Sequence, residues 1–227
     1  MATTDASAAL PLQRKRWFLL VTAWLLGAIV TILATIAWGG DLGWHLLPFN
    51  AYVFFPVLGL VAYSLMWSQY AAGAISELTD TDGAILLRYF KTTGWIVLVL
   101  ICLHPGLLIY QRFHDGFGLP PHSYESYVAP GLGWVTLLGS ASLLVFLAYE
   151  FHRVFGNRPW WRYLQVAVDA AMVAIFYHGL RLGNETGHGW FRVVWWFYGL
   201  TLILILIRTY SLKYLHRQSA AKQKPGS

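Results

Sequence analysis

The chain has 227 residues, of which 57% are hydrophobic and only 11% are charged, whereas a soluble domain carries about 25% charged residues. This composition excludes a sizeable soluble domain and indicates a polytopic membrane protein. The net charge of +6 does not point to nucleic acid, because the basic residues lie beside apolar segments, and the single Cys102 excludes a disulfide framework or a cysteine-based metal site.

Six apolar runs are long enough to cross a bilayer, which takes about 20 residues each. In chain order they cover residues 17–39, 50–69, 93–113, 131–151, 162–182 and 190–211. The first run follows a basic segment, as in a signal peptide, but it is too long for one and no cleavage site follows, so we interpret it as a retained span. The sequence therefore predicts an all-α, six-helix membrane bundle over residues 17–212. An N-terminal segment, 1–16, precedes it and a basic tail, 213–227, follows it.

Lysine and arginine predict the orientation of these spans. If the N-terminus is cytoplasmic, the outer segments hold only three of the 16 basic residues, namely Arg112, Arg181 and Arg192. Because basic residues concentrate on the cytoplasmic side, the pattern predicts that both termini are cytoplasmic, in the cell (inner) membrane. The other 13 are Arg14, Lys15, Arg16, Arg88, Lys91, Arg153, Arg158, Arg162, Arg208, Lys213, Arg217, Lys222 and Lys224.

Two connecting segments carry simpler predictions. The inner segment from residue 76 to residue 90 contains Asp80, Asp82 and Gly83, which is typical of a turn between helices. The polar, basic end of the chain, residues 218–227, is predicted to be disordered.

Two histidines stand deep in apolar spans: His104 in the third and His178 in the fifth. They lie about 14 Å and about 6 Å from the outer ends of their spans, at 1.5 Å per residue. Ionisable residues at membrane depth are functional candidates, and two histidines on different helices can hold a haem iron from both sides. The alternative is that each histidine only donates a hydrogen bond to a neighbouring helix. Pro105 and Gly179 follow the two histidines, and the glycine leaves room for a flat ligand to approach.

The surroundings of these histidines resemble a known pattern. In the third span, the basic residues Arg88 and Lys91 precede WIVLVLICL and then His104 with Pro105. The fifth span opens with Trp161-Arg162-Tyr163-Leu164-Gln165 and reaches His178-Gly179 13 positions after the glutamine. Over residues 50–212 the chain thereby resembles the ferric-reductase-like transmembrane family. That family includes NADPH oxidases, ferric reductases and the haem-binding membrane subunit of methionine sulfoxide reductase systems.

The resemblance implies a b-type cytochrome subunit, with residues 17–212 as its haem-binding domain and His104 and His178 as axial ligands. Two-haem members also have inner histidines, and Phe90 and Gln165 stand at those positions, so one haem b is expected. The subunit would pass single electrons towards an acceptor on the outer side, as an oxidoreductase component that needs a separate donor. A quinol in the bilayer or an external flavoprotein could be that donor, since no Gly-rich dinucleotide motif occurs in the chain.

The alternative is a haem-free member of the fold that acts as a transporter or as a membrane assembly partner. The sequence leaves the redox partner protein and the oligomeric state open.

Further polar residues are secondary candidates. Arg112 and Arg181 could pair with haem propionates on the outer side, or could be interfacial residues that reach toward the head groups. Asp169 lies within the fifth span and could be a proton-handling carboxylate or a partner for a buried Arg or Tyr. Alternatively, it could be a protonated acid that is hydrogen-bonded to a neighbouring helix. Four histidines in the outer loops lack the close spacing of a metal site, and we interpret them as solvated; they are His45, His114, His122 and His188.

Overall fold

The computed structural model describes residues 6–45, 50–155 and 161–222, and these residues form helices and no strands. The predicted all-α class is confirmed. The long helices are α1 (Ala6–Asp41), α2 (Ala51–Leu78), α3 (Leu87–His114), α5 (Gly133–Phe155), α6 (Trp161–Leu182) and α8 (Gly189–Lys222). Between them lie the 3₁₀ turn η1 (Gly83–Leu86) and the short helices α4 (His122–Glu125) and α7 (Asn184–Gly187).

All six predicted spans correspond to helices that are long and apolar enough to cross a membrane. The chain is therefore a multi-pass membrane protein in a lipid bilayer. Most of the helices continue past the apolar runs, because backbone hydrogen bonds hold a helix together in water as well as in lipid.

Two predictions about segments between and after the spans were partly wrong. The inner connection is shorter than predicted, since α2 continues to Leu78 and only residues 79–82 separate it from η1, where the Asp82 carboxylate accepts a bond from the Ala84 N–H at 2.9 Å. The predicted disordered tail begins as helix, because α8 runs on to Lys222; residues 223–227 lie outside the described residues.

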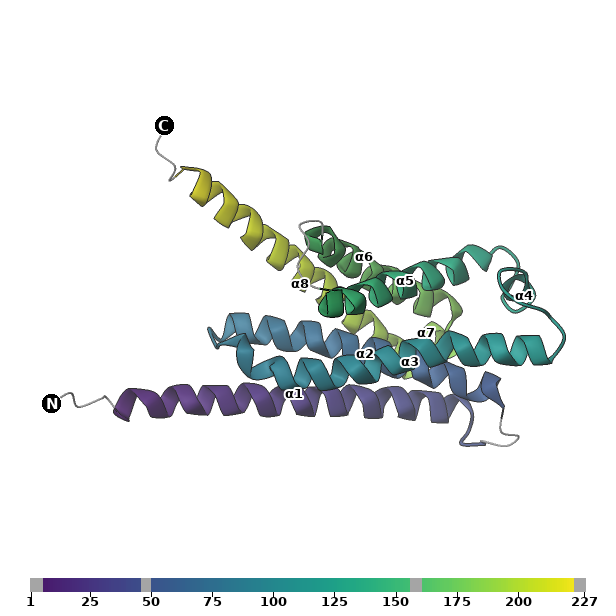
Figure 1. Ribbon diagram of the computed structural model, residues 1–227. Helices are drawn as coiled ribbons and strands as arrows, with labels where there is room; N and C mark the ends of the chain where they lie inside the picture. Colours follow the sequence, from purple (N-terminus) through teal and green to yellow (C-terminus); the bar gives the residue numbers. More distant parts are fainter. Residues whose placement is uncertain (1–5, 46–49, 156–160, 223–227) are drawn as a thin grey trace.

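The helices are arranged as two antiparallel pairs with two further helices against them (Figure 1). In the first pair α2 packs along α3, and α1 covers the other side of α2. In the second pair α5 packs along α6. Helix α8 contacts both α2 and α6 and so joins the two pairs. The start of α1 and the end of α8 lie at the same side of the bundle, opposite α4 and α7, as six crossings require (Figure 1).

Large aromatic residues fill the core between α2 and α8. The rings of Tyr63 and Trp195 are 4.5 Å apart, and those of Trp67 and Tyr198 are stacked at 4.4 Å. All four side chains are buried. Since hydrophobic side chains in lipid gain little by association, close packing of large flat rings is what holds these helices together.

Candidate functional site

The ring of His104, on α3, is oriented by a hydrogen bond to the neighbouring helix α2. Its Nδ1 lies 2.6 Å from the carbonyl oxygen of Phe55 on α2, and the two rings are 5.2 Å apart. A carbonyl oxygen only accepts hydrogen bonds, so Nδ1 must carry the proton. In the neutral imidazole, the lone pair then sits on Nε2.

His178 repeats this arrangement in the second helix pair. Its Nδ1 lies 2.9 Å from the carbonyl oxygen of Val135 on α5, which fixes the same tautomer. No hydrogen-bond partner for either Nε2 occurs among the residues that the structure describes. Ligating histidines in metal sites commonly have this second hydrogen bond, which orients the ring and makes the free nitrogen more basic.

Two glycines make room for the imidazole rings, and sequence reasoning missed both. Gly59 lies four residues after Phe55, and Gly139 lies four residues after Val135. A Cβ atom on Gly59 would be 2.8 Å from Cε1 of His104, and one on Gly139 would be 2.7 Å from Cε1 of His178. Glycine at a helix–helix contact was a usable signal, because small residues let backbones approach, but the sequence does not say which helix each glycine faces.

Both imidazoles line one cavity of about 640 Å³ between the two helix pairs. This volume lies in the range of small-molecule and cofactor pockets, about 300–1,000 Å³. The structure thus brings together the two histidines that the sequence singled out. The wall of the cavity is mostly apolar, and its residues include Leu60, Met66, Ile101, Leu108, Phe146 and Trp195.

The end of the cavity near α7 is polar. Arg181 lines it together with Asp41 and Glu185. Glu185 is only 8% exposed, and burial, reinforced by the nearby Asp41 charge, raises the pKa of its carboxyl group. The Arg181 guanidinium thus lies at this end of the cavity together with Glu185, an acid whose negative charge is disfavoured by burial.

Arg112 is buried next to the cavity rather than in its lining. Its guanidinium donates to the hydroxyl of Ser126, and its Cζ lies 3.5 Å from the centre of the Phe117 ring and 5.7 Å from that of Tyr127. Tyr127 does line the cavity. Arg112 thus supports the ring of Tyr127, which is part of the cavity wall, from behind.

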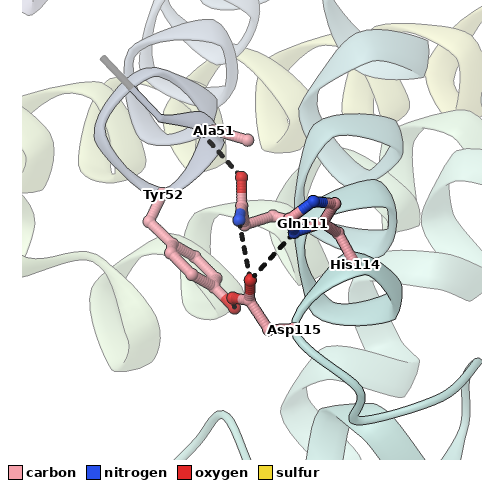
Figure 2. A network of polar contacts seen from close by, with 5 residues as sticks. All are labelled: Ala51, Tyr52, Gln111, His114 and Asp115. Atoms are coloured by element: carbon pink, nitrogen blue, oxygen red, sulfur yellow. Dashed lines mark hydrogen bonds and ion pairs between the residues drawn. The ribbon is translucent and has the colours of Figure 1, made fainter. Parts of the chain in front are cut away.

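A polar network ties the start of α2 to the end of α3 (Figure 2). The hydroxyl of Tyr52, a cavity residue at the start of α2, donates to Asp115 at 2.7 Å, just after α3 ends. Gln111 also donates to Asp115, at 2.9 Å, and accepts from the backbone of Ala51. These bonds hold the pKa of Asp115 below its usual range, with the Tyr52 bond as the largest cause. The network fixes α3 against the α2 turn that binds His104.

Asp169, on α6, is hydrogen-bonded to two neighbouring helices. Its carboxylate accepts hydrogen bonds from Tyr70 on α2 at 2.6 Å, from Tyr210 on α8 at 2.7 Å and from Gln165 at 3.2 Å. The structure bears out the expectation of a tyrosine partner and of bonds to neighbouring helices, while proton handling stays a prediction. The side-chain amide of Gln165, the residue expected from the resemblance at a lost inner ligand position, donates to Asp169.

Gly179 was expected to leave space for a flat ligand, and it does line the cavity. A Cβ there would also collide with the ring of Trp195, so this glycine accommodates a tryptophan as well. No group of three or more His, Cys, Asp or Glu side chains that could hold a metal ion occurs among the described residues, and His114 pairs with Asp115 at 3.4 Å.

Comparisons of the chain with protein-family models, with curated proteins and with solved structures find no match. The resemblance to the ferric-reductase-like family stays a prediction, and the site has to be judged on its own geometry.

Proposed function

We propose that this chain is a b-type cytochrome subunit that carries single electrons through one haem b held between His104 and His178. One observation carries the proposal. Two histidines from separate helix pairs line the same cavity, and each has Nδ1–H bonded to a backbone carbonyl, so that both Nε2 lone pairs are available to a metal. Cofactor sites in helix bundles are built in this way, from side chains on facing helices.

The rest of the cavity suits the same cofactor. Haem is a large apolar disc with two carboxylates, and this cavity has an apolar wall and a cation, Arg181, at its outer end. The raised pKa of Glu185 favours its neutral form, which reduces repulsion of an anionic group there. In this proposal Arg181 pairs with a haem propionate, and Arg112 supports the ring of Tyr127 in the cavity wall.

A bound haem would supply reversible one-electron chemistry, which none of the side chains provides. The protein orients the two imidazoles, excludes water from the apolar wall and brings the cavity close to the outer ends of α3 and α6. Electrons would leave on that side, to an external acceptor, and would come from a quinol in the bilayer or from a separate flavoprotein. In this role the chain is an oxidoreductase component rather than a complete enzyme.

Absorption spectroscopy of the purified protein tests the proposal. Wild type should show the Soret and alpha bands of a reducible low-spin haem b, and a pyridine haemochrome assay should give close to one haem per chain. His104→Ala and His178→Ala should each lose most of the haem, while His188→Ala, outside the cavity, should retain it. A haem-free wild type expressed with haem available would favour the transporter or assembly-partner alternative, and full unshifted spectra in both alanine variants would exclude bis-histidine ligation.

A further inference from the structure

Glu185 is a buried acid whose carboxyl group faces the cavity. Its side chain is only 8% exposed, and it lines the same cavity as His104 and His178. Apart from its own backbone N–H, the carboxyl group has no hydrogen-bond or salt-bridge partner in the described part of the chain. Ligand sites in apolar pockets commonly use a few polar groups of this kind to hold the polar part of the ligand.

The turn of chain that carries Glu185 is fixed to the end of α6. The Thr186 hydroxyl donates to the carbonyl oxygen of Gly179 at 2.5 Å and to that of Gly183 at 3.1 Å. A Cβ on Gly183 would be 2.6 Å from the Thr186 hydroxyl oxygen, so glycine is what allows α7 to fold back on the last turn of α6. The backbone of Glu185 is therefore held at the cavity, four residues after Arg181, which lines the same end.

Three ionisable groups from other segments act on Glu185. Asp41 at the end of α1 disfavours its ionisation, His188 after α7 favours it, and Tyr127 also lies within interaction range. Burial is the largest influence, and the net result is a pKa above the usual range of a glutamate. Glu185 can therefore hold a proton at a pH at which exposed glutamates have lost it.

We propose that Glu185 takes up a proton when a cofactor bound between His104 and His178 gains an electron. This inference rests on the proposed function. The protonated carboxyl group of Glu185 would donate to one haem carboxylate, and Arg181 would pair with the other. Hydrogen bonds from an O–H group to a carboxylate are short and strong because the acceptor is charged.

Proton uptake follows from the charge in the cavity. An added electron makes the cavity more negative, and negative charge nearby favours the protonated form of a carboxyl group. In the full step, one electron from the quinol or the flavoprotein reduces Fe(III) to Fe(II), and up to one proton from the solvent adds to the Glu185 carboxylate. Glu185 thus offsets the charge of the electron at the end of the cavity near α7.

Redox titration of the haem-loaded protein at a series of pH values tests the proposal. The midpoint potential of wild type should fall as pH rises, because the reduced state binds more protons than the oxidised state. The limit for one proton per electron is about 59 mV for each tenfold change in proton concentration. Glu185→Gln, which cannot ionise, should lose most of this slope and keep the low-spin spectrum. Glu77→Gln is the matched control, since this exposed acid pairs with Arg208 and does not line the cavity.

A second variant keeps Glu185 and changes its surroundings. Asp41→Asn removes a negative charge that disfavours ionisation of Glu185, so the pH range over which the potential changes should move to lower pH. If Glu185→Gln fails to retain haem, this shift decides the outcome. Infrared difference spectra should also show the carbonyl band of a protonated carboxyl group growing on reduction in wild type.

Two results would overturn the role of Glu185 and leave the proposed function standing. One is a midpoint potential of wild type that does not change with pH. The other is a slope that is the same in wild type and Glu185→Gln, or a pH range that Asp41→Asn does not move. Absence of haem from wild type would instead overturn the proposed function, and this inference with it.

Discussion

At the residue scale, the protein orients each candidate ligand with backbone rather than with another side chain. The carbonyls of Phe55 and Val135 cannot rotate independently of their helices, so the imidazoles they bind are fixed with them. Within the bilayer core there is no bulk water to compete for these hydrogen bonds. The orientation of both rings therefore depends on how closely α3 approaches α2 and α6 approaches α5.

Alanine at either contact glycine should disturb the site without affecting membrane insertion. A Cβ at Gly59 or Gly139 would lie under 3.0 Å from an imidazole carbon, so the ring has to move and its carbonyl bond has to lengthen. Loss of such an orienting bond typically weakens metal binding about 10–100-fold. We expect Gly59→Ala and Gly139→Ala to lower the haem content or to shift the Soret band.

The controls are Gly73→Ala and Gly106→Ala, since an added Cβ there meets no atom within 4 Å. If all four variants keep the wild-type spectrum, the close fit of ring and glycine does not matter for haem binding.

Glu185 should make stability depend on pH at the outer end of the cavity. Burial raises the pKa of its carboxyl group in the folded protein, so between the unfolded and the folded pKa the folded state holds more protons. The free energy of unfolding then falls as pH rises through that window, and the loss is complete above the folded pKa. Thermal unfolding in detergent should show that Glu185→Gln gains stability relative to wild type as pH increases. A difference that stays constant with pH would contradict this.

At the scale of helices, Asp169 connects three of them in the inner half of the bundle. Tyrosines from α2 and α8 donate to a carboxylate on α6, which is 6% exposed. Because α8 contacts both helix pairs, this contact helps to set how the pairs are placed and so supports the shared cavity.

Removing either tyrosine hydroxyl should destabilise the bundle. A side-chain hydrogen bond contributes about 1–3 kcal/mol, so Tyr70→Phe and Tyr210→Phe should each lower the free energy of unfolding by an amount of that order. Because both bonds end on the same carboxylate, the double variant should depart from additivity. Tyr177→Phe serves as the control in denaturation experiments. Wild-type stability in both single variants would show that these bonds contribute nothing.

At the scale of the whole molecule, the proposed direction of electron transfer depends on topology. The start of α1 and the end of α8 lie at one side of the bundle (Figure 1), and 13 of the 16 basic residues belong to the segments predicted for that side. A cysteine at Gly187 should react with a membrane-impermeant thiol reagent in intact cells, and one at Ser219 should not. Cys102→Ser provides the background, because Cys102 is exposed on α3. The reverse labelling would place the cavity mouth in the cytoplasm and reverse the proposed direction of electron transfer.

Hydropathy was enough to predict the six spans and to single out His104 and His178, because a bilayer imposes its thickness on apolar runs and makes each ionisable residue within them conspicuous. Helix ends were less predictable, as α8 shows, since hydropathy marks where lipid is required and not where a helix stops.

That His104 and His178 line one cavity could not be predicted from the chain, because the path of a helix across its neighbours depends on side-chain packing throughout the bundle. Packing likewise decides three other contacts: the bond between Phe55 and His104, the close approach of Gly139 to His178, and the bonds from two tyrosines to Asp169. Each of these contacts joins residues distant in the chain, and the local sequence carries no record of which helix will be the partner.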